Sequence, residues 1–180
     1  KVHLVDITPL HVQLAEEASR RQPETPLASA SIGDACELNW EPETVDGVLL
    51  LGPLYHLTDR QGRFQALREA QRVLKPGGVL LAVGISRFAS MFDGLRNGYL
   101  KDAQFREIVQ KDLKTGHHQN STAKPEYFMD TFFHHPDELR DEVAAAGFRI
   151  GSVYGIEGPS WLVHDFDDWW DNSELRERVL

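Results

Sequence analysis

Carboxylates and a glycine follow three short apolar runs of the sequence, where predicted strands end. Asp6, Asp34 and Gly52 each lie at or just after such a run. Ligands of a parallel α/β sheet bind beyond the carboxyl ends of its strands, so these residues are candidates for a binding site. The two oxygens of Asp6 match the vicinal hydroxyls of a ribose, and Asp34 could accept a hydrogen bond from an adenine amino group. Gly52 permits close approach of the backbone to a ligand.

Both carboxylates also have a structural interpretation. Asp6 precedes a predicted helix, where a solvated acid favours the positive end of the helix dipole. Gly33-Asp34 is a pair that is common in turns. Position in the sequence does not separate these interpretations from ligand binding.

Histidine and tyrosine side chains supply candidates for acid–base chemistry. Tyr55 and His56 follow the run 45–51 and would line the mouth of a crevice at the strand ends. A histidine there could act as a general base near neutral pH, or could pack against the next helix. His117 and His118 are further candidate bases, and Tyr127 could orient a polar acceptor.

The histidine pairs do not have the spacing of a metal site. His117-His118 and His134-His135 are adjacent in sequence, and adjacent side chains point in different directions on a helix or a strand. Cys36 is the one cysteine, so neither a thiolate cage nor an internal disulfide can form. We therefore expect no metal site.

Apolar periodicity and turn residues predict strands that alternate with helices. The strands are expected at 2–6, 27–32, 45–51, 79–85 and 148–156, and the helices at 9–20, 59–74 and from Pro136 to just before Gly147. The run 45–51 is almost continuously apolar, which is typical of a strand buried on both faces. Lys75-Pro76-Gly77-Gly78 suits a type II turn. This order predicts an α/β fold with an open, mostly parallel sheet and helices on both faces.

Composition limits the possible functions. The 180 residues are enough for one domain, 41% of them are hydrophobic, and the net charge is −9. Such an acidic chain is a poor binder of nucleic-acid backbones. The longest apolar runs are too short to cross a membrane. With no disulfide and no recognisable targeting signal, we expect a cytoplasmic location.

Several segments together resemble the class I S-adenosylmethionine-dependent methyltransferases. The similar segments are Val2–Asp6 with the helix after it, Gly33-Asp34-Ala35, Val45–His56, Arg72-Val73-Leu74-Lys75-Pro76-Gly77-Gly78, and Ala145 to Phe148. The segment from Arg72 to Gly78, which enters an apolar strand, is the most specific of these. The resemblance implies a Rossmann-like sheet and S-adenosylmethionine as the cofactor.

The resemblance also implies roles for individual residues. Asp6 would bind the ribose hydroxyls and Ile7 would flank the adenine. Asp34 would meet the adenine amino group and Ala35 the adenine ring, while Leu51 and Gly52 would line the methionine portion. Tyr55 and His56 would face the transferred methyl group and the substrate, with His56 as the candidate base. The insert 87–135, which contains His117 and Tyr127, would form a lid over the substrate between the family's fifth and sixth strands.

One feature of the family is missing from the sequence. Its glycine-rich loop follows the first, central strand, and no Gly-x-Gly occurs among the 14 glycines of this chain. We therefore expect residues 1–180 to be one incomplete domain that lacks the family's first and last strands and is inactive alone.

The leading hypothesis is methyl transfer from S-adenosylmethionine to a small-molecule acceptor. A nicotinamide-dependent oxidoreductase is the alternative enzyme class, because Asp6 could bind the ribose of either cofactor. A non-catalytic partner subunit, binding another protein through an open sheet, is the third hypothesis.

Overall fold

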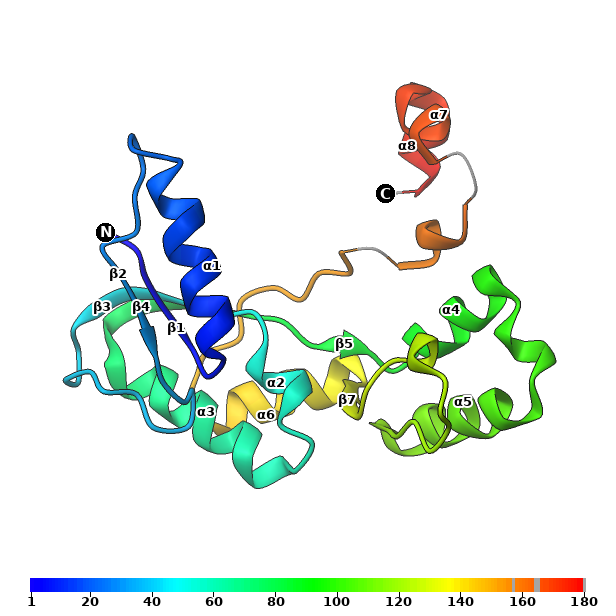
Figure 1. Cartoon of the computed structure of the whole chain (residues 1–180), viewed down its shortest axis with the longest axis horizontal. Coiled ribbons are helices and arrows are strands. Elements are labelled where there is room, and N and C mark those ends of the chain that lie inside the picture. The colour runs from blue at the N-terminus through cyan, green and yellow to red at the C-terminus, as the bar shows by residue number, and fades with distance from the viewer. Residues whose placement is uncertain (157, 164–165, 180) are drawn as a thin grey trace. The chain divides into compact units, whose positions relative to one another are not determined.

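The computed structural model describes residues 1–156, 158–163 and 166–179. The chain divides into two compact units (Figure 1). Unit 1 comprises residues 1–84 and 141–149, and unit 2 comprises residues 85–140 and the described part of 150–180.

Unit 1 contains two parallel strand pairs. β1 (His3–Asp6) pairs with β2 (Ser29–Ile32), and β3 (Val45–Leu50) pairs with β4 (Leu74–Ala82). Among the residues that the structure describes, no strand pairs with both β1 and β3. The parallel direction agrees with the sequence prediction, but the strands form separate pairs in place of one continuous sheet.

Helices cover these pairs. α1 (Pro9–Arg20) packs on β1 and β2, and α3 (Arg60–Val73) packs on β3 and β4. The fixed φ of Pro9 suits the first position of α1. Asp59 caps α3 by accepting a hydrogen bond from the Gly62 N–H at 2.8 Å. The short α2 (Pro53–His56) contacts α3, and α6 (Pro136–Ala145) begins in unit 2 and ends in unit 1.

The β3–β4 pair has one covered face and one bare face. The buried apolar side chains of unit 1 belong mainly to α3 and its neighbours; they include Leu50, Leu54, Ala66, Leu67, Ala70, Val73 and Leu74. In contrast, four leucine and valine side chains of the pair and its flank are 51–63% exposed: Leu49, Leu51, Val79 and Leu81. The prediction that residues 45–51 are buried on both faces is therefore wrong, because no described element covers the second face.

The predicted turn at residues 75–78 lies inside β4 as a break in strand register. Val45 pairs with Leu74, whereas Gly47 already pairs with Val79. Gly77 has φ +81°, a left-handed conformation that a type II turn requires. Lys75 Nζ donates to Asp46 Oδ1 at 2.7 Å across this break.

Unit 2 combines helices with a small mixed sheet. β7 (Thr131–His134) pairs in parallel with β5 (Ile85–Ser86) and antiparallel with β6 (His117–His118). The helical segments are α4 (Ala89–Asn97), η1 (Tyr99–Lys101), α5 (Ala103–Thr115), η2 (Pro125–Tyr127), η3 (Gly158–Leu162), α7 (Phe166–Asp171) and α8 (Ser173–Val179). Phe105, Ile108, Val109 and Tyr127 form its buried core.

The strand predicted at 148–156 is not found. α6 ends at Ala145, just before Gly147 as expected. Gly147 has φ +99°, and the N–H of Phe148 donates to the carbonyl oxygen of Val143. Residues 148–156 then have no strand pairing, and Tyr154 and Ile156 are about four-fifths exposed. A strand needs a neighbour to satisfy its backbone groups, and none of the described strands lies beside this segment.

Candidate functional site

Asp6 lies at the carboxyl end of β1, and the first turn of α1 holds its side chain. The Thr8 N–H donates to Asp6 Oδ1 at 2.8 Å, and His11 Nδ1 lies 3.3 Å from each carboxylate oxygen. The hydrogen bond from the Thr8 N–H, followed by the contact with His11, lowers the pKa of Asp6. Asp6 is therefore an ionised, half-buried acceptor at a strand end.

Asp34 follows the neighbouring strand end. The Gly33 N–H donates to the Asp6 carbonyl oxygen at 3.1 Å, which ties the two strand ends together. A Cβ on Gly33 would lie 2.8 Å from a methyl group of Val5, so a side chain there would have to displace Val5. The exposed Asp34 side chain accepts a hydrogen bond from the Cys36 N–H at 2.8 Å. This Asx turn agrees with the turn interpretation of Asp34.

The predicted adenine contacts flank these carboxylates. Ile7 directly follows Asp6 and is 68% exposed. Ala35 follows Asp34 and is half-buried. The β1–β2 pair thus places two carboxylates and two apolar side chains at one edge.

The segment after β3 presents the other predicted residues. The Tyr55 hydroxyl donates to the Leu51 carbonyl oxygen at 2.9 Å, which closes the turn around Gly52. His56 is exposed, and its ring centroid is 4.7 Å from that of Tyr55. His56 is therefore accessible to a ligand, as a general base has to be.

Two residues near these strand ends were missed by sequence reasoning. His11 lies five positions after Asp6, and only the turn at Thr8-Pro9 brings the two side chains together. The Cys36 thiol donates to the Gly62 carbonyl oxygen, and burial, followed by the charge of Asp34, raises the pKa of Cys36 to about 11. This thiol is consequently a poor nucleophile at neutral pH.

The remaining candidates lie in unit 2. His117 is exposed, with its ring 5.1 Å from that of Phe132. Tyr127 is 3% exposed, and its hydroxyl donates to Asp102 Oδ2 at 2.8 Å. This burial favours a structural role for Tyr127 over the predicted contact with substrate. His118 is also buried and paired with Asp112, so it is not an accessible base.

The described part of the chain has neither a metal-ligand cluster nor a membrane-spanning helix. It contains no group of three or more histidine, cysteine or acidic residues that could hold a metal ion. None of its helices combines the length and apolar character needed to cross a bilayer.

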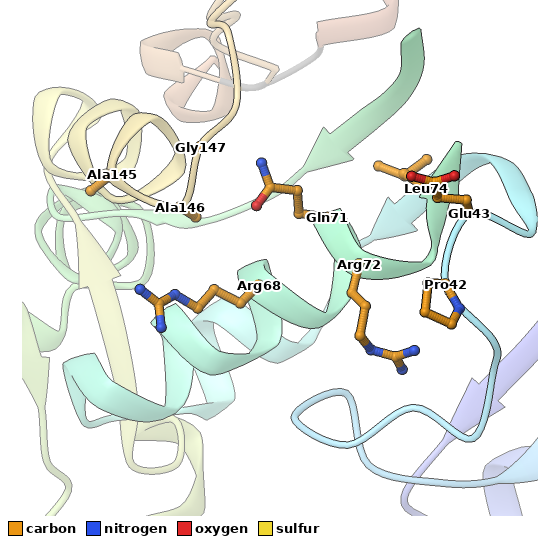
Figure 2. A pocket seen from close by; sticks show the side chains of 9 residues that line it. All are labelled: Pro42, Glu43, Arg68, Gln71, Arg72, Leu74, Ala145, Ala146 and Gly147. Carbon is orange, nitrogen blue, oxygen red and sulfur yellow. The ribbon is translucent and has the colours of Figure 1, made fainter. Parts of the chain in front are cut away.

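A shallow hollow lies at the opposite end of the β3–β4 pair (Figure 2). Glu43 precedes β3, Leu74 begins β4, and Arg72 ends α3 beside them. Arg72 is already engaged, because it donates to Glu69 and to the carbonyl oxygens of Leu38 and Trp40. This hollow is at the amino ends of the strands and does not mark the predicted cofactor site.

Residues 1–82 match the family profile described as a methyltransferase domain. The match confirms the resemblance to class I S-adenosylmethionine-dependent methyltransferases, with S-adenosylmethionine as the family's cofactor, over the oxidoreductase alternative.

One curated protein is similar to part of the chain. Erythromycin 3''-O-methyltransferase of Saccharopolyspora erythraea is 39% identical over 80 residues, which are 44% of this chain and 25% of that protein. The matched segment thus spans about a quarter of that curated relative.

Solved structures confirm the Rossmann-like fold. A SAM-dependent methyltransferase from Methanosarcina mazei superposes with a TM-score of 0.63 at 22% identity, covering 84% of this chain and 70% of the other. A possible histamine N-methyltransferase from Thermotoga maritima gives a TM-score of 0.52 at 20% identity, covering 83% and 55%.

Proposed function

We propose that this protein transfers a methyl group from S-adenosylmethionine to a small-molecule acceptor in the cytoplasm. The observation that carries the proposal is the pair of carboxylates, Asp6 and Asp34, at the ends of adjacent parallel strands within the methyltransferase domain. The name of the erythromycin methyltransferase, which specifies a small-molecule acceptor, supports the acceptor class.

The residues at these strand ends suit a nucleoside. Asp6 is ionised and would accept hydrogen bonds from the ribose hydroxyls, and Asp34 would accept one from the adenine amino group. Ile7 and Ala35 offer apolar surface for the two faces of the adenine ring. Leu51 and Gly52, held by Tyr55, would contact the methionine portion.

The protein would contribute to the reaction mainly by orienting the acceptor relative to the cofactor. When bound, the cofactor supplies a methyl group on a positively charged sulfur, which is already activated for in-line displacement. The protein has to hold the acceptor in line with that bond. His56 would remove the proton from a hydroxyl or ammonium acceptor, and Tyr55 would line the substrate side.

We propose that the insert 87–135 also takes part in substrate binding. Residues 87–135 would act as the lid, with the exposed His117 as a substrate contact. Tyr127 would stabilise the core of the lid, where its hydroxyl donates a hydrogen bond to Asp102.

Isothermal titration with S-adenosylhomocysteine tests this proposal. Asp6→Ala and Asp34→Ala should each weaken binding about 10- to 100-fold, since a hydrogen bond to a charged group contributes roughly 1.5–3 kcal/mol. Asp46→Ala is the matched control, because Asp46 is an exposed aspartate of β3 paired with Lys75. Absence of binding, or equal binding by all variants, would contradict the proposal.

A further inference from the structure

His11 contacts the carboxylate that the proposed function assigns to the ribose. Its Nδ1 atom lies 3.3 Å from Oδ2 and 3.3 Å from Oδ1 of Asp6. The His11 ring therefore contacts both oxygens of this carboxylate. The Thr8 N–H occupies a different position, because it donates to Oδ1 alone.

A ribose diol would need the same two carboxylate oxygens that His11 contacts. Bidentate binding places one hydroxyl on each carboxylate oxygen. The His11 ring lies beside both oxygens in the structure. Its side chain is 59% exposed, so rotation of the ring into solvent could vacate the space without disturbing a core.

We infer that His11 is a gate on the ribose site, which competes with the cofactor for Asp6 and does so more strongly when protonated. This inference rests on the proposed function. The competition is expected to depend on pH, because only a charged imidazolium forms an ion pair with the carboxylate. Asp6, whose pKa lies below its ordinary value, stays ionised over this range.

Asp6 is the one charged group that the described neighbouring elements present to His11. Asp6 on β1 is the carboxylate in contact with the ring. The first turn of α1 has no acidic residue, and β2, with the sequence Ser-Ala-Ser-Ile, has no charged side chain. The other histidine of β1, His3, is bonded to the Ser29 hydroxyl at 2.8 Å and does not contact Asp6.

Titration of the full 180-residue chain with S-adenosylhomocysteine at about pH 5.5 and about pH 8 tests the gate. The wild-type protein should bind about two- to fivefold more weakly at the lower pH, as expected for loss of an exposed ion pair. His11→Ala should bind more tightly at the lower pH and with equal affinity at both. His3→Ala, the control, should retain the wild-type pH dependence.

The outcomes separate the gate from the proposed function. Weaker binding by His11→Ala would show that His11 supports the ribose carboxylate, and would overturn the inference alone. A pH dependence that survives in His11→Ala would also overturn it alone. Absence of binding by the wild-type protein at both pH values would overturn the inference and the proposed function together.

Discussion

Single residues inside unit 2 show how strongly surroundings determine the role of a histidine. His118 Nδ1 lies 2.7 Å from Asp112 Oδ2, and its Nε2 lies 2.8 Å from the Tyr127 carbonyl oxygen. Both ring nitrogens therefore face acceptors, which only the doubly protonated ring can satisfy. Burial alone lowers the pKa of His118, but hydrogen bonding and charge from Asp112 outweigh it and raise the pKa overall.

This raised pKa predicts a stability that depends on pH. The protonated His118 stabilises the folded state below the ordinary histidine pKa, and the stabilisation is lost as the pH rises through the higher folded-state pKa. The protection of α5 amide groups, relative to their intrinsic exchange rate at each pH, should therefore fall from mildly acidic to alkaline pH. Asp93 on α4 and Asp130 are the other acidic groups that interact with His118.

Adjacent histidines provide the control for this measurement. His118→Gln should lower the protection of α5 amide groups from exchange. It should also remove the part of the pH dependence of that protection that the titration of His118 causes. His117→Gln should leave that dependence unchanged, because His117 is exposed. Identical exchange profiles for the wild-type protein and His118→Gln would show that the buried pair is not protonated as proposed.

At the scale of elements, a buried ion pair joins α3 to the end of α6 within unit 1. Arg63 Nε and one terminal nitrogen donate to the two oxygens of Glu142 at 2.9 and 2.8 Å. Another nitrogen of Arg63 donates to the carbonyl oxygens of Leu57 and Thr58. Arg63 is 2% exposed and Glu142 5%, so each charge depends on the other for solvation.

Arg63→Met is expected to lower the free energy of unfolding by about 3–5 kcal/mol, because it leaves the Glu142 carboxylate buried without its main partner. Arg63→Met combined with Glu142→Leu should recover much of this loss. Urea unfolding measures both variants. Arg68→Met is the control on the same helix; Arg68 stacks on Phe64 at 4.5 Å, and its loss should cost about 1 kcal/mol or less. Equal losses for Arg63→Met and Arg68→Met would contradict the pairing.

Across the whole molecule, a departure from the sequence pattern lies in unit 1, where apolar side chains that were predicted to be buried are exposed. Leu49 and Leu81 are register partners on β3 and β4, and both are more than half exposed. A contiguous apolar surface of this kind favours association with another apolar surface.

We expect this face to bind the dye ANS and to contribute little to stability. Leu81→Ala should reduce ANS fluorescence while lowering the free energy of unfolding by less than about 1 kcal/mol, since much of the side chain is already in water. Leu67→Ala, at a fully buried leucine of α3, should cost about 2–5 kcal/mol. A comparable cost at position 81 in urea unfolding would show that the face is covered in solution.

Local patterns predicted the elements best. The expected helix over 59–74 agrees with α3, because Asp59 caps it and the apolar spacing repeats every turn. The position of Asp6 at the end of β1 and of Asp34 just after β2 was also predicted. In contrast, the His11 contact depends on how a turn is folded, and the absence of a strand at 148–156 depends on which neighbours are available for pairing.

Hydrophobic period and turn chemistry, which act over a few residues, are enough to predict the alternation of strands and helices, the parallel direction of the pairs, and the placement of Asp6, Asp34 and Gly52 at strand ends. The packing of Tyr127 inside a core and the bare face of β3 and β4 emerge only in the folded molecule, because burial depends on residues far away in the chain. The pairing of His118 with Asp112, six positions earlier, depends on how the chain turns after α5.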